Sequence, residues 1–108
     1  MKLDHFALYV EDLEGMKSFY EKYFKAGANE LYYNPETGLK TYFLTFDGGG
    51  RLELMARPDV VPVGKEMPSM GYAHLAVGAG GRDEVERVFE IRRRSGEGYD
   101  GKVVKHVW

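Results

Sequence analysis

The sequence predicts an α+β fold in which a short strand followed by an amphipathic helix occurs twice. The segments "MKLDHFALYV" and "GYAHLAVGAG" both alternate in the manner of a strand, and a charged stretch with helical spacing follows each of them. Their histidines, His5 and His74, lie 74 − 5 = 69 residues apart, and the same offset relates Met16 to Val85. This constant offset indicates a weak internal repeat.

The first unit, residues 1–57, is predicted to contain a strand, a helix and three further strands. Residues 2–10 alternate as the first strand. Apolar residues then recur at three- and four-residue steps over 13–24, which predicts a helix with Asp12 as its N-cap and Gly27 as its stop signal. The remaining strands are expected at 29–33, 39–46 and 51–57, with the turn signals "NPETG" and "DGGG" between them.

The second half of the chain is shorter than the first. Residues 58–70 contain three of the four prolines and no clear period, which predicts a linker. Residues 71–108 are predicted to form a strand at 72–77, a helix over 80–94 and one more strand at 102–108. We therefore expect a single domain over 1–108, in which the second unit lacks two strands of the first.

Composition excludes several classes of protein. The chain has 15 basic and 17 acidic residues, so its net charge is −2, unlike that of a nucleic-acid binder. No apolar run approaches the ~20 residues of a membrane span. No cysteine is present, so any metal must be held by His, Asp or Glu. We expect a soluble, cytoplasmic protein with no nucleic-acid or membrane partner.

Three side chains could together hold a metal ion: His5, Glu53 and His74. The histidines occupy equivalent mid-strand positions, so both would face a shared cleft if the two units pair about a pseudo-twofold axis. Two imidazoles and a carboxylate suit Zn²⁺, Ni²⁺, Fe²⁺ or Mn²⁺. Taken singly, each histidine is more simply a packed residue, and Glu53 a solvent-facing partner of Arg51 or Arg57. Only the coincidence of all three favours a divalent metal.

Three segments of the chain resemble one known family. They are "MKLDHFALYVEDLEGMKSFYEKYF", "YFLTFDGGGRLELM" and "GYAHLAVGAGGRDEVERVFE". Together they are similar to the vicinal oxygen chelate superfamily, in its glyoxalase, bleomycin-resistance and dioxygenase branch. The resemblance covers about residues 1–91. It implies paired βαβββ modules with a curled mixed sheet: module one at 1–57, the linker at 58–70 and an incomplete module two at 71–108.

The resemblance also implies a ligand set. The family's enzymes use a His on the first strand, a Glu on the last strand of module one and a His that opens module two. These positions match His5, Glu53 and His74, and Glu53 would also be the catalytic base. A fourth carboxylate, which glyoxalases place on the final strand of module two, has no match in this chain, and no motif makes His106 its substitute. The resemblance therefore implies a chain that is shortened at its C-terminal end.

The function implied is that of a metal-dependent lyase or isomerase similar to lactoylglutathione lyase. The metal would bind two adjacent substrate oxygens, and a carboxylate would move the proton. The residues expected to contact the small-molecule substrate are Tyr9, Tyr42, Met55 and Arg51, whereas core packing is favoured for Phe43.

Two other functions stay open. One is a non-catalytic binding module of the bleomycin-resistance type, which holds a small molecule without metal. The other is an inactive shortened remnant. An incomplete module two would leave strand edges unpaired, so we expect a homodimer.

Overall fold

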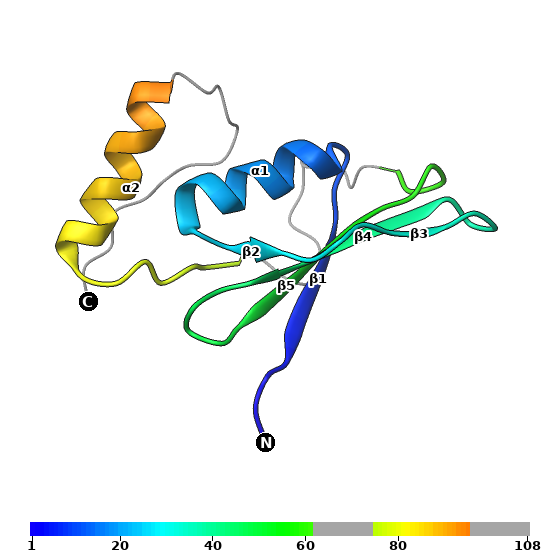
Figure 1. Ribbon diagram of the computed structural model, residues 1–108, viewed down its shortest axis with the longest axis horizontal. Coiled ribbons are helices and arrows are strands. Elements are labelled where there is room, and N and C mark those ends of the chain that lie inside the picture. The colour runs from blue at the N-terminus through cyan, green and yellow to red at the C-terminus, as the bar shows by residue number, and fades with distance from the viewer. Residues whose placement is uncertain (62–74, 96–108) are drawn as a thin grey trace, which may run out of the picture. The chain divides into compact units, whose positions relative to one another are not determined.

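The computed structural model describes residues 1–61 and 75–95 (Figure 1). The chain divides into two compact units, Met1–Val63 and Gly64–Trp108. The division falls within residues 58–70, where the sequence predicts a linker. The assignment of these units as module one and a partial module two stays a prediction.

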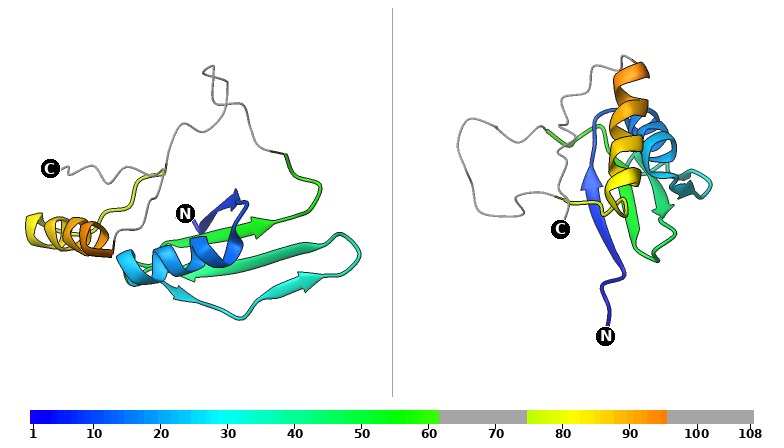
Figure 2. Two further views of the ribbon diagram at one scale, coloured as in Figure 1. Left: turned by 90° about the horizontal axis from the view of Figure 1, so that it is seen from above. Right: turned by 90° about the vertical axis from the view of Figure 1, so that its left-hand side faces the viewer.

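Unit one contains one helix and a five-stranded mixed sheet. Its elements are β1 (His5–Tyr9), α1 (Leu13–Phe24), β2 (Gly27–Ala28), β3 (Tyr32–Asn34), β4 (Leu39–Thr45) and β5 (Arg51–Ala56). The strand order is β1-β5-β4-β2, and β3 also pairs with β4. β1 runs parallel to β5, whereas the other pairs are antiparallel. The α+β class is thus confirmed by one βαββββ module, but Figures 1 and 2 show an open sheet where the family resemblance implies a curled one.

The strands β4 and β5 agree with the predicted strands 39–46 and 51–57 to within a residue. The strand predicted at 29–33 is confirmed only at Tyr32 and Tyr33, which belong to β3, because residues 29–31 form a break between β2 and β3, which pair with different parts of β4. Asn29 lies in this break. Its backbone N–H donates to the carbonyl oxygen of Phe43 at 3.1 Å, and its side-chain oxygen accepts from the Phe43 N–H at 2.8 Å. A side chain therefore replaces one rung of the backbone ladder.

The helix α1 begins as the sequence predicts. The Asp12 side chain accepts a hydrogen bond from the backbone N–H of Gly15 at 3.0 Å, which is the geometry of an N-cap. The predicted stop at Gly27 is wrong. Lys25 itself adopts the left-handed conformation (φ 55°), and the helix ends at Phe24. Gly27 instead begins β2.

The core lies between α1 and one face of the sheet, where α1 packs on β2, β4 and β5 (Figure 2). Strand alternation directs Tyr42, Leu44, Leu52 and Leu54 toward the helix, and each is at most 7% exposed. The helix contributes Leu13, Tyr20 and Tyr23. The opposite side of the sheet, named here the open face, carries the alternate residues of the same strands. They are His5, Ala7 and Tyr9 of β1, Thr41, Phe43 and Thr45 of β4, and Arg51, Glu53 and Met55 of β5.

Unit two contributes α2 (Arg82–Ser95), which confirms a helix at the predicted position. Asp83 and Glu84 lie in its first turn, where acidic side chains favour the helix dipole. Residues 75–80 have no regular secondary structure, so the part of the predicted strand 72–77 that the structure describes is not a strand. The rest of that strand, with His74, and the predicted strand 102–108 lie outside the described residues. Neither α1 nor α2, as far as they are described, is long and apolar enough to cross a membrane.

Candidate functional site

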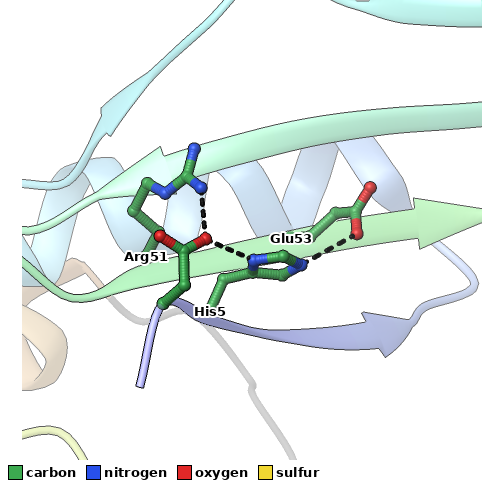
Figure 3. A network of polar contacts seen from close by, with 4 residues as sticks. His5, Arg51 and Glu53 are labelled. Atoms are coloured by element: carbon green, nitrogen blue, oxygen red, sulfur yellow. Dashed lines mark hydrogen bonds and ion pairs between the residues drawn. The ribbon is translucent and has the colours of Figure 1, made fainter. Parts of the chain in front are cut away.

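The open face brings His5 and Glu53 together. The parallel register of β1 and β5 places His5 opposite Arg51 and Ala7 opposite Glu53. Because Ala7 carries only a methyl group, it leaves room for the longer His5 side chain to reach the diagonal neighbour. Nε2 of His5 lies 3.9 Å from Oε1 of Glu53 (Figure 3). Two of the three metal ligands predicted from the sequence are therefore adjacent.

Asp4 contacts one of the two ring nitrogens of His5. Its Oδ2 lies 2.7 Å from Nδ1 of His5 and also accepts a hydrogen bond from Nη2 of Arg51. These hydrogen bonds, that of His5 first and then that of Arg51, lower the pKa of Asp4 below its ordinary value of 3.8. An ionised carboxylate can only accept, so this contact favours a proton on Nδ1 of His5.

Phe43 supports this arrangement from β4. Its ring lies edge-on to His5, with the ring centroids 5.2 Å apart and the planes at 79°. The guanidinium of Arg51 lies 4.7 Å from the centroid of the same ring. Such edge-to-face and cation–π contacts restrict the side chains that make them. The core role predicted for Phe43 is wrong, because strand alternation places it on the open face.

The donors suit a divalent cation in chemistry. Imidazole nitrogen and carboxylate oxygen bind such ions at ~2.0–2.2 Å, so donors on opposite sides of one ion lie ~4.2 Å apart and donors at a tetrahedral angle ~3.4 Å apart. The separation of 3.9 Å lies between these values, so a small movement of the two side chains would let them bind one ion as neighbours. A histidine that binds a metal usually donates its other ring N–H to a carboxylate, and Nδ1 of His5 lies 2.7 Å from Asp4. The Glu53 side chain is 18% exposed and that of His5 is 37% exposed, so the pair is accessible from the open face.

The third predicted ligand, His74, lies outside the described residues. Within residues 1–61 and 75–95, no group of three or more His, Cys, Asp or Glu side chains is placed to hold a metal ion. Unit one therefore presents two neighbouring donors. Any complete site needs at least one donor from elsewhere.

The residues expected to contact substrate are not all on one side of the sheet. Tyr9 and Met55 are register partners on the open face, where Arg51 also lies. Tyr42 lies on the helix side, is 7% exposed and donates its hydroxyl to Oε1 of Glu14 at 2.5 Å. This hydrogen bond raises the pKa of Tyr42. The structure thus groups three of the four residues and separates Tyr42 from them.

Two members of the network are absent from the sequence-based site. Asp4 precedes the strand and shows no periodic pattern, and the available signal is an acidic residue directly before a histidine. Phe43 stands between Thr41 and Thr45, and these two polar neighbours on its own face mark that face as the less apolar one.

The comparisons with known proteins agree with this fold. Over residues 2–108 the chain matches the Glyoxalase/Bleomycin resistance protein/Dioxygenase superfamily. The chain belongs to this superfamily. The resemblance inferred from the three sequence segments is thereby confirmed. No curated protein sequence matches the chain.

Two solved structures have folds similar to that of this chain. The genomically encoded fosfomycin resistance protein FosX from Listeria monocytogenes, complexed with Mn(II) and sulfate ion, gives a TM-score of 0.63 at 22% identity, over 88% of this chain and 71% of that one. A monoclinic form of FosX at pH 5.75 gives 0.63 at 21% identity, over 94% and 77%. At this identity the likeness shows the fold, and the activity must be argued from the site.

Proposed function

We propose that the open face of unit one supplies part of a metal-dependent site for a small substrate with two adjacent oxygen atoms, in the manner of a glyoxalase-type lyase or isomerase. The observation that carries the proposal is the approach of His5 Nε2 to Glu53 Oε1 at 3.9 Å, while Asp4 holds Nδ1. Two electron-rich atoms face each other there. A cation between them turns their repulsion into attraction.

We further propose His5 and Glu53 as ligands from unit one and His74 as the third ligand, within the paired-module arrangement of the superfamily. Zn²⁺, Ni²⁺, Fe²⁺ and Mn²⁺ all accept such donors. The FosX structure of similar fold was obtained with Mn(II), so Mn(II) is the first ion to test. We propose that the complete site forms in a homodimer. Among the described strands, β1 is an edge strand that pairs with β5 alone, and its residue Tyr9 is 52% exposed. This edge is where a second copy of the chain could pair.

A divalent ion held there would stabilise the negative charge that develops on the substrate oxygens. Glu53 would receive the substrate proton through a carboxylate oxygen. Arg51 has five N–H donors, and Asp4 accepts from one of its nitrogens, so an anionic substrate group could bind the others. Tyr9 and Met55 would contact the apolar part of the substrate. Tyr42 is not part of this proposal, because it lies on the helix side of the sheet.

The test is Mn(II) and Zn(II) binding to the full chain by calorimetry, together with elemental analysis. We expect His5→Ala and Glu53→Gln each to weaken binding at least 10-fold. Glu36→Gln, which removes an exposed carboxylate from the turn between β3 and β4, is the matched control and should bind like the wild type. Equal metal affinity in His5→Ala and the wild type would remove His5 from the site.

A second function is favoured by the half-exposed aromatic surface around Tyr9 and Phe43 on the same face. A binding module of the bleomycin-resistance type would use this surface to hold a small molecule without metal. The two functions differ in their response to a chelator. Ligand binding that persists unchanged after treatment with EDTA would favour the metal-free module over the metal-dependent enzyme.

A further inference from the structure

We propose that Asp4 is a positioning residue that holds His5 in the Nδ1–H tautomer and so keeps the Nε2 lone pair directed at Glu53. The inference deepens the proposed metal site and rests on it for its functional consequence. Its physical content, the tautomer of His5, is a property of the metal-free protein. The two claims can therefore fail independently.

The position of Asp4 is determined by tertiary contacts. It precedes β1, so the β1–β5 ladder does not fix its orientation. Instead, Arg51 of β5 donates a hydrogen bond to Oδ2, and the Arg51 guanidinium lies over the ring of Phe43 of β4 at 4.7 Å. Residues of β5 and β4 thus hold the Asp4 carboxylate against Nδ1 of His5, at 2.7 Å. Figure 3 shows Arg51 and Glu53 on the two sides of the imidazole.

The chemistry of the two ring nitrogens explains why this matters. A neutral imidazole has one N–H and one lone pair, and the partner of one nitrogen determines the state of the other. With the proton on Nε2, the ring would donate toward Glu53, while its Nδ1 lone pair would face the Asp4 carboxylate. Asp4 makes that tautomer unfavourable. The remaining tautomer is the one whose Nε2 can bind a cation.

The test measures the tautomer directly by long-range ¹H–¹⁵N spectroscopy of the metal-free full chain at alkaline pH. The chain has three histidines, so His5→Gln identifies the signals of His5. We expect the wild type to be protonated at Nδ1. We expect Asp4→Ala to shift the proton wholly or partly to Nε2, and Asp4→Glu to restore the wild-type pattern at least in part.

Arg51→Met is the matched variant, because it removes the other partner of Asp4 and keeps the Asp4 carboxylate itself. It should retain more of the Nδ1–H tautomer than Asp4→Ala does. Mn(II) affinity should fall by about 10- to 100-fold in Asp4→Ala, as for other residues that orient a metal-binding histidine. Thermal unfolding and far-UV circular dichroism show whether each variant is folded.

The same tautomer in Asp4→Ala and the wild type would overturn the inference, whatever the metal affinities are. If the wild type binds no metal while the tautomer depends on Asp4 as expected, the metal site fails and the positioning role of Asp4 stands.

Discussion

Two exposed carboxylates, Asp4 and Asp59, have similar electrostatic surroundings and different consequences. Each accepts hydrogen bonds from an arginine, and each has a lowered pKa. Asp59 takes two bonds from Arg57, at 2.9 and 2.8 Å, and forms a local ion pair two residues along the chain. Asp4 joins Arg51 to His5, and so links two strands to a candidate ligand. Asp4 therefore differs from Asp59 in its second partner, His5, which belongs to the candidate site.

The Asp59–Arg57 pair predicts a pH dependence of stability. Hydrogen bonds from Arg57 are the main cause that lowers the pKa of Asp59 below 3.8, and the same contact raises the pKa of Arg57. The stabilisation is therefore present above the unfolded-state pKa and is lost as the pH falls through the lower folded-state pKa.

We expect Asp59→Asn to lower the thermal midpoint slightly at neutral pH, and the difference from the wild type to shrink as the pH falls below 3.8. Melting curves across this range at low salt measure the effect. A difference that widens on acidification would contradict the assignment.

At the scale of the elements, the two faces of the sheet divide stability from chemistry. The alternation in β4 and β5 sends Leu44, Leu52 and Leu54 to the helix side, whereas Arg51 and Glu53 of β5 lie on the open face. Tyr42 and Phe43 are chain neighbours with opposite roles: one packs against α1, and the other supports His5 and Arg51. Packing on the helix side therefore fixes the positions of the strands whose other side chains form the open face.

Leu44 provides the test at this scale. It is 0% exposed on the helix side of β4, so Leu44→Ala should lower the free energy of unfolding by about 2–5 kcal/mol. Leu31→Ala removes the same atoms from a side chain that is 43% exposed and is the matched control. We expect the control to change stability by no more than about 0.5 kcal/mol. Chemical denaturation measures both, and equal losses in the two variants would show that Leu44 is not a core residue.

At the scale of the whole molecule, the proposed site needs more than unit one. His5 and Glu53 lie on two adjacent strands of this unit, and the third proposed ligand, His74, belongs to the other unit. In the proposed homodimer, His5 and Glu53 of one chain would meet His74 of the partner subunit. Such an arrangement can be recognised without knowledge of the substrate, because it predicts complementation between defective chains.

We expect the wild type to be a dimer by light scattering, and His5→Ala and His74→Ala each to bind Mn(II) poorly alone. After unfolding and refolding together, half of the randomly formed dimers are mixed, and each mixed dimer has one intact site. About one quarter of the wild-type Mn(II) sites should then return. A site built within one chain would show no recovery, and a monomeric wild type would contradict the dimer.

The periodic elements could be predicted from the sequence because their signals are local. Helical spacing and a capping aspartate place the start of α1, and strand patterns place β4 and β5. The break at Asn29 could not be predicted from local patterns, because it depends on a hydrogen bond to a distant strand. The end of α1 could not be predicted either, because Lys25 adopts the left-handed conformation that the glycine signal placed two residues later.

The sequence by itself predicted the α+β class, the superfamily, and His5 and Glu53 as candidate ligands, and the structure then brings these two side chains together. Only the tertiary structure decided that Asp4 orients His5, that Phe43 lies on the open face and that Tyr42 does not. The physical reason is strand pairing. A shift of one residue in the β1–β5 register would send His5 to the other face, and that register depends on contacts between residues 46 positions apart in the chain, such as His5 and Arg51 (51 − 5 = 46).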